Sequence, residues 1–138
     1  MCDVSDPQIA ESYRAISNIA DKSSINWIVL GYEGRNKLKV IGTGTGGINE
    51  ATALLQPNEC YYGLFRVTFK AADDTERTKF ALFAYAGPEA SILKKGNMSV
   101  HKASVKSIFR DFALEIQTAD INELTEDEVV ERIKKVNY

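Results

Sequence analysis

Residues 61–70 read YYGLFRVTFK and residues 78–86 read TKFALFAYA, with the hydrophilic segment AADDTER between them. Both stretches are rich in aromatic and β-branched residues, so they predict two strands joined as a hairpin. Side chains alternate along a strand, and one face of the first strand is apolar to its end. That face carries Tyr61, Phe65, Val67 and Phe69. The opposite face becomes polar toward the loop, so we expect the loop end of this hairpin to project from the body of the protein.

The chain before this hairpin predicts a helix and a second hairpin. Asp6-Pro7 is a favourable helix start, because an oxygen-bearing side chain caps the first turn and proline suits its first position. Apolar residues then recur every three to four positions, which predicts a helix over residues 7–20. Residues 25–32 and 38–42 are rich in β-branched and aromatic residues and flank the turn-like segment EGRN, so they predict a hairpin.

The chain after residue 86 predicts two helices with a short strand between them. Apolar residues at i, i+3, i+4 and i+7 predict a helix that begins near Met98, with a short turn at residues 91–95 before it. These apolar residues are Val105, Ile108, Phe109 and Phe112. Residues 114–117 alternate in polarity, as a short strand would. Thr125 and Glu128 have the spacing of a capping box, which predicts the start of the last helix.

A short helix over residues 48–55 completes the order: helix, two strands, short helix, two strands, helix, strand, helix. Helices at both ends and in the middle, with hairpins between them, indicate an α+β fold. We expect a central mixed five-stranded sheet sandwiched by helices. A length of 138 residues suits one core. We therefore expect a single domain over residues 1–138, with its core at roughly residues 4–136.

Composition excludes several classes of protein. The formal net charge is -2, whereas a protein that coats nucleic acid usually has a marked basic excess. No run approaches the roughly 20 apolar residues of a membrane span, and the first residues do not resemble a secretory signal. Cys2 and Cys60 are the cysteines, and two thiols so placed indicate reduced cysteines of a cytosolic protein. We expect a cytoplasmic monomer that binds no nucleic acid and has no transmembrane segment.

The sequence offers little for catalysis. The glycine-rich run at residues 42–47 lacks the Lys-Ser or Lys-Thr of a P-loop, so a flexible connection with unusual backbone angles is favoured over a nucleotide site. His101 is the lone histidine and has no partners for a metal site, which favours a hydrogen-bonded histidine at the edge of the core. Eight acids between Asp111 and Glu131 are typical of a solvated face. We therefore expect no enzyme, no metal and no cofactor.

A basic segment precedes that acidic one. Residues 90–110 contain five basic side chains, one histidine and no acid. The basic residues are Lys94, Lys95, Lys102, Lys106 and Arg110. A solvated outer helix face explains this pattern as well as a binding surface does. A locally basic patch on an acidic protein is nevertheless a suitable docking surface for an acidic partner, since charge pattern guides encounter and register.

Several short segments, taken in their order, resemble a known family. They are Asn26-Trp27, Tyr32-Glu33-Gly34, RTKFAL at 77–82, KASVK at 102–106, FALEI at 112–116 and Glu123-Leu124. With the element order and the length, they resemble the actin-depolymerising-factor (ADF) homology family, whose fold is gelsolin-like, and its coactosin branch in particular. The resemblance implies a cytoskeletal protein that binds along the sides of actin filaments (F-actin), counteracts capping of their barbed ends and severs them little.

The resemblance also implies two binding surfaces. The first is the long helix with the N-terminal segment, which meets actin at a cleft; Lys102 and Lys106 match its basic positions, and Arg110 extends them. The second is the projecting hairpin with the C-terminal helix, which serves filaments specifically. Its positions are matched by Arg77, Lys79, Lys134 and Lys135.

Two alternatives stay open from the sequence. The first is a cofilin-like factor that severs and depolymerises filaments. Against it, the long helix carries fewer lysines than in typical cofilins, and the start of the chain lacks their regulatory serine followed by glycine. The second is an adaptor that binds acidic phosphoinositides through the basic segment at residues 90–110.

Overall fold

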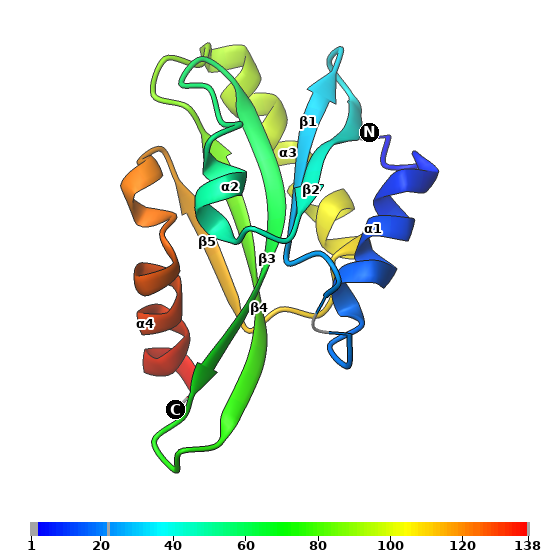
Figure 1. Ribbon diagram of the computed structural model, residues 1–138. Coiled ribbons are helices and arrows are strands. Elements are labelled where there is room, and N and C mark those ends of the chain that lie inside the picture. The colour runs from blue at the N-terminus through cyan, green and yellow to red at the C-terminus, as the bar shows by residue number, and fades with distance from the viewer. Residues whose placement is uncertain (1–2, 22, 138) are drawn as a thin grey trace.

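The computed structural model describes residues 3–21 and 23–137, and it contains a five-stranded sheet with helices on both faces (Figure 1). The strand order is β2-β1-β3-β4-β5. The bounds are β1 Trp27–Glu33, β2 Lys37–Gly44, β3 Cys60–Lys70, β4 Glu76–Ala86 and β5 Leu114–Thr118. The first four strands pair antiparallel, and β5 pairs parallel with β4. The expected mixed sheet is therefore confirmed.

Two helices pack on each face of the sheet. On one face α1 (Pro7–Ser17) and α3 (Ile92–Ile108) enclose a core with the inward side chains of β1, β3 and β4. On the other face α2 (Ile48–Thr52) and α4 (Glu126–Asn137) enclose a second core, and a 3₁₀ turn, η1 (Ile121–Glu123), leads into α4. The two helices that carry the predicted cations, α3 and α4, thus lie on opposite faces of the sheet.

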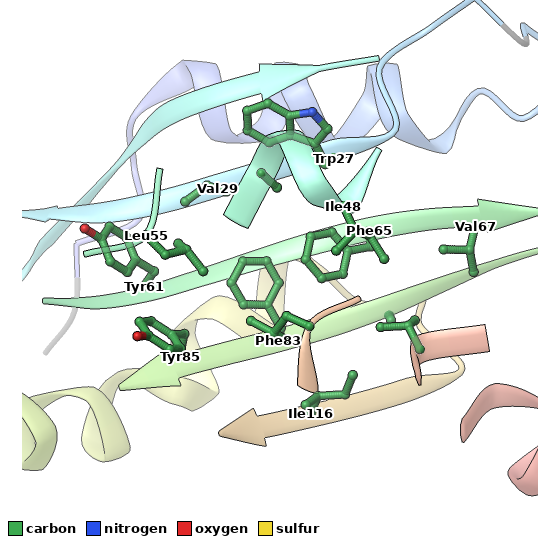
Figure 2. Close-up of a cluster of buried hydrophobic side chains, with 14 of the residues drawn as sticks. Trp27, Val29, Ile48, Leu55, Tyr61, Phe65, Val67, Phe83, Tyr85 and Ile116 are labelled. Atoms are coloured by element: carbon green, nitrogen blue, oxygen red, sulfur yellow. The ribbon is translucent and has the colours of Figure 1, made fainter. Parts of the chain in front are cut away.

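Strand β3 explains why both faces are covered. Its side chains alternate between the two cores: Tyr62 and Leu64 contact the α1–α3 side, while Phe65 and Val67 contact the α2–α4 side. The rings of Phe65 and Phe83 stack with centroids 4.6 Å apart in the middle of the second core (Figure 2). Burying each such aromatic side chain contributes on the order of 1.5–3 kcal/mol. The apolar face expected for this strand is confirmed.

The β3–β4 hairpin is long, and its loop end extends away from the rest of the molecule beside the end of α4 (Figure 1). Its pairing is unbroken from Cys60 opposite Ala86 to Lys70 opposite Glu76. The outermost positions are exposed on one face of β3, at Thr68 and Lys70. The projecting hairpin predicted from the sequence is confirmed.

Helix α1 begins where predicted but ends earlier. The side chain of Asp6 accepts a hydrogen bond from Gln8 N, as a cap should. The helix ends at Ser17 rather than at residue 20, because the chain turns there toward Arg66 of β3. The Arg66 guanidinium donates to four backbone carbonyls at the end of the helix and in the following loop. They belong to Ile16, Asn18, Asp21 and Ser24.

Helix α3 begins well before the predicted position. Ser91 caps it by accepting a hydrogen bond from Lys94 N, and the helix runs on from Ile92 instead of beginning near Met98. The prediction was wrong because it followed the buried face, and the first buried side chain of the helix is Met98. The preceding turns point their apolar side chains outward, so they do not extend that periodicity.

The glycine-rich run has a different role from the expected one. Gly42 and Gly44 belong to β2, where the Trp27 side chain lies against the strand backbone. A Cβ atom at Gly44 would lie 2.7 Å from Trp27 Nε1, which itself donates to Glu50 Oε1 at 2.9 Å. Within the described run, positive φ is confined to Gly47 (83°), just before α2. Two of the four glycines, Gly42 and Gly44, therefore leave room for the indole, and Gly46 leaves room for the Glu50 side chain.

Candidate functional site

The predicted cations lie on two surfaces, which we name for their main elements. The hairpin surface combines the outer part of β4 with the last turns of α4. Its basic residues are Arg77, Lys79, Lys134 and Lys135. The helix surface is the solvent side of α3 and the residue after its cap, with Lys102, Lys106 and Arg110. The structure therefore brings the predicted residues together as two groups and not as one site.

On the hairpin surface, β4 and α4 contribute to the same side of the sheet. Arg77 and Lys79 stand opposite Phe69 and Val67, whose side chains point into the core under α4. The Lys134 Nζ atom lies 5.6 Å from the centroid of the Phe69 ring, a cation–π contact between the last helix and the hairpin. This contact ties α4 to the hairpin and holds a positive charge beside the two basic residues of β4.

The other residues of the hairpin surface differ in their exposure to solvent. Lys135 is exposed, and Lys79 is half-buried at the point where the hairpin leaves the body. The Arg77 guanidinium lies 3.4 Å from the Asp73 carboxylate in the loop, in an exposed pair of the kind that contributes little to stability.

On the helix surface, the two lysines are engaged by strand β5. The Glu115 carboxylate forms an ion pair with Lys102 and a second one with Lys106, whose Nζ lies 2.8 Å from Oε1. Lys102 also donates to Gln117 Oε1 at 3.0 Å. Burial raises the pKa of Glu115, but the hydrogen bonds and charges of the two lysines outweigh it and hold this pKa below its usual value. Arg110 is exposed after the end of α3.

An apolar strip on α3 was missed by the sequence reading. Ile92 is 89% exposed, Leu93 61% and Val100 73%, all on the side of the helix that faces away from the sheet. Several large apolar side chains exposed along one side of a helix are typical of a surface that a partner covers. The signal was present in Ser91, a capping residue three positions before Lys94, which would have moved the predicted helix start and placed these residues outward.

His101 lies at the edge of the core, as predicted. It is 3% exposed, and its Nδ1 lies 2.9 Å from the Tyr32 hydroxyl. Burial lowers the pKa of its imidazole. Cys60 is a buried free thiol, and the other cysteine, Cys2, lies outside the described residues. Among residues 3–21 and 23–137, no group of histidine, cysteine and acidic side chains is arranged to hold a metal ion.

In the part of the chain that the structure covers, no helix is both long and apolar enough to span a bilayer. One cavity of about 380 Å³ lies between the β1–β2 turn and the first turns of α3, and Tyr32, Arg35 and Lys94 are among its lining residues. Another, of about 330 Å³, lies on the outer part of the hairpin, with Thr68, Glu76 and Thr78 among its lining residues.

Comparison with known proteins places the chain in a family. The model of the cofilin/tropomyosin-type actin-binding proteins matches residues 1–134. The chain is 35% identical to coactosin of Dictyostelium discoideum over 98% of its own length and 91% of that protein. It is 31% identical to coactosin of Entamoeba histolytica, over 85% of its own length and 80% of the other.

Solved structures agree in fold. The crystal structure of the Entamoeba histolytica coactosin superposes with a TM-score of 0.85 at 26% identity, covering 97% of this chain and 95% of that one. A human coactosin-like protein superposes with a TM-score of 0.87 at 21% identity, over 98% and 99% of the two chains. The chain therefore belongs to the ADF/cofilin family of actin-binding proteins. Within that family it is coactosin-like, because it is at least 30% identical to the two coactosins above and to the coactosin-like protein of Rattus norvegicus.

Proposed function

We propose that this protein binds along the sides of actin filaments, with the hairpin surface as its filament-specific contact. The observation that carries the proposal is the contact of Lys134 with the Phe69 ring, which joins α4 to the hairpin. This contact holds the end of α4, which carries Lys134 and Lys135, beside the projecting hairpin, which carries Arg77 and Lys79. Such an edge suits an acidic polymer, because cations that become partly desolvated against carboxylates give both register and affinity.

The helix surface supplies the second contact in this proposal. The outward strip of Ile92, Leu93 and Val100 offers apolar area for a cleft on the partner, with Lys102 and Lys106 along one flank. Burial of apolar side chains contributes on the order of 25 cal/mol per Å² before the cost of association is subtracted. This surface therefore binds mainly through its apolar centre, with the lysines at its rim.

We propose a finer activity that the resemblance to coactosins implies: the protein protects barbed ends from capping proteins and severs filaments little. We propose that it does so as a cytoplasmic monomer of one domain, without a cofactor and without enzymatic activity. Acidic phosphoinositides are a weaker candidate ligand, because Lys94 is paired with Glu59 at 2.9 Å and the two lysines of α3 are paired with Glu115.

Cosedimentation with filamentous actin at several salt concentrations tests the proposal, with actin monomers as the parallel sample. We expect pelleting that falls as salt rises, because exposed charges are screened, while the mass of filament in the pellet stays constant. Release of actin into the supernatant would instead indicate the cofilin-like activity. Absence of pelleting at every salt concentration would refute filament binding. Pelleting with phosphoinositide vesicles but not with filaments would indicate the adaptor.

A further inference from the structure

Two lysines of the helix surface share one carboxylate that belongs to the protein itself. Glu115 and Gln117 alternate along β5 with the buried Ile116, which faces the α4 side, so both point toward α3. Lys102 contacts both of them, and Lys106 contacts Glu115. The net charge of Lys102, Lys106 and Glu115 together is +1, although the two lysines alone would give +2.

These ion pairs are partly removed from solvent. The side chain of Glu115 is 24% exposed, and those of Lys102 and Lys106 are 30% and 41% exposed. An attraction at such a site is screened less than one on an open surface. An acidic group of a partner must therefore displace Glu115 from the lysines. If it does not, its attraction to the lysines is reduced by the negative charge of Glu115.

The hairpin surface has no such arrangement at Lys134. The described partner of its Nζ is the face of an aromatic ring, which orients the ammonium group without neutralising it. Lys134 and the two lysines of α3 consequently differ in the charge that they offer to an acidic partner, whereas Arg77 of the hairpin surface is itself paired with Asp73.

We propose that Glu115 is an affinity-setting residue, whose carboxylate attenuates the helix surface so that this surface alone holds actin monomers weakly. This inference rests on the proposed function, in which monomers use the helix surface alone and filaments use both surfaces. Attenuating the shared surface lowers both affinities by a similar factor, so monomers are left with weak binding while filaments are still held through the hairpin surface.

The substitution Glu115→Gln tests this inference, because it removes the charge and keeps the shape of the side chain. We expect binding of fluorescently labelled actin monomers at low salt to tighten by about threefold to tenfold, the size expected when two partly exposed ion pairs no longer compete. The matched control is Glu123→Gln. It removes the same charge from a carboxylate that pairs with Arg132 of α4 instead of the α3 lysines, and it should leave monomer binding unchanged.

Unchanged or weaker monomer binding by a folded Glu115→Gln protein would overturn the inference, because Glu115 would then be aligning the lysines for binding. Glu115→Ala carries the same prediction if the glutamine variant does not fold. A second test substitutes Lys106→Gln and leaves Glu115 unchanged. We expect it to weaken monomer binding by less than about threefold, and a loss above tenfold would also overturn the inference. Cosedimentation of the wild-type protein with filaments tests the proposed function separately. If the wild type does not pellet with filaments, the proposed function is refuted, whatever the effect of Glu115→Gln.

Discussion

The hairpin surface and the helix surface show how similar sets of basic residues come to differ in use. On the hairpin surface, Lys134 lies against an aromatic ring and Lys79 lies where the hairpin leaves the body. On the helix surface, Lys102 and Lys106 are paired with a carboxylate from the neighbouring strand, and the exposed centre is apolar. The difference teaches that a basic helix is not by itself an electrostatic binding surface, because what faces it across the fold decides how much charge it offers.

The largest effect is expected for Lys79→Ala on filament binding. Loss of one partner of a desolvated charge pair costs about 2–5 kcal/mol of binding free energy, so filament affinity should fall by more than tenfold. Cosedimentation of the folded variant measures it. The matched control is Lys37→Ala on β2, a half-exposed lysine paired with Glu33 at the far edge of the sheet, which should pellet as the wild type does. Equal pelleting by both variants would remove Lys79 from the hairpin surface.

A charge within the apolar strip should have the next largest effect, on monomer binding. Val100→Asp places a carboxylate where the partner covers apolar side chains, and an unpaired charge is costly to bury. We expect monomer affinity to fall by about tenfold or more, and filament affinity to fall by a similar factor while filaments stay bound through the hairpin surface. Thr43→Asp, at an exposed position of β2, is the control. Unchanged monomer binding by the folded Val100→Asp protein would show that the apolar strip is not part of the binding surface.

A smaller effect is expected for Lys134→Gln, which removes the charge but keeps most of the stem over the ring. An exposed ion pair between Lys134 and an actin carboxylate would contribute about 0.2–1 kcal/mol of binding free energy. We therefore expect a loss of filament affinity of roughly threefold and an unchanged monomer affinity. Titration of filaments with the labelled variant measures both. A larger loss of affinity for monomers than for filaments would show that Lys134 is not a filament-specific contact.

The smallest predicted effect concerns stability and not binding. Burial lowers the pKa of His101 from about 6.5, so the unfolded chain takes up a proton at a higher pH than the folded one. The stability gained from burying the neutral His101 imidazole is fully present above about pH 6.5. The free energy of unfolding should fall as the pH decreases through and below that value. Urea unfolding at pH 7.5 and at pH 5 measures it, and His101→Gln should reduce the difference. A stability that rises toward pH 5 in the wild type and not in this variant would contradict the assignment.

Much of the fold could be predicted from local sequence. The alternation in residues 61–70 assigned side chains to the two cores, and Asp6-Pro7 set the start of α1. Thr125 likewise set the start of α4, where its Oγ1 accepts a hydrogen bond from Glu128 N at 3.2 Å. The Glu128 carboxylate, however, accepts from Arg132, so the described bonds complete only one half of the predicted capping box.

The rest depended on contacts between distant segments. The end of α1 depends on Arg66 of β3, which no local pattern around residue 17 contains. The apolar strip was not predicted, because the apolar periodicity of α3 marks only its buried face. The pairing of Glu115 with Lys102 and Lys106 requires β5 to lie parallel to β4 and beneath α3, and that placement is a property of the assembled sheet.

Cryo-electron microscopy of actin filaments decorated with the wild-type protein tests the central claim most directly. We expect the loop end of the β3–β4 hairpin and the last turns of α4 to lie against the filament, with Lys79 and Lys134 within ion-pair distance of actin carboxylates. A decorated filament in which this hairpin points into solvent, with the protein held through α3 alone, would contradict the account.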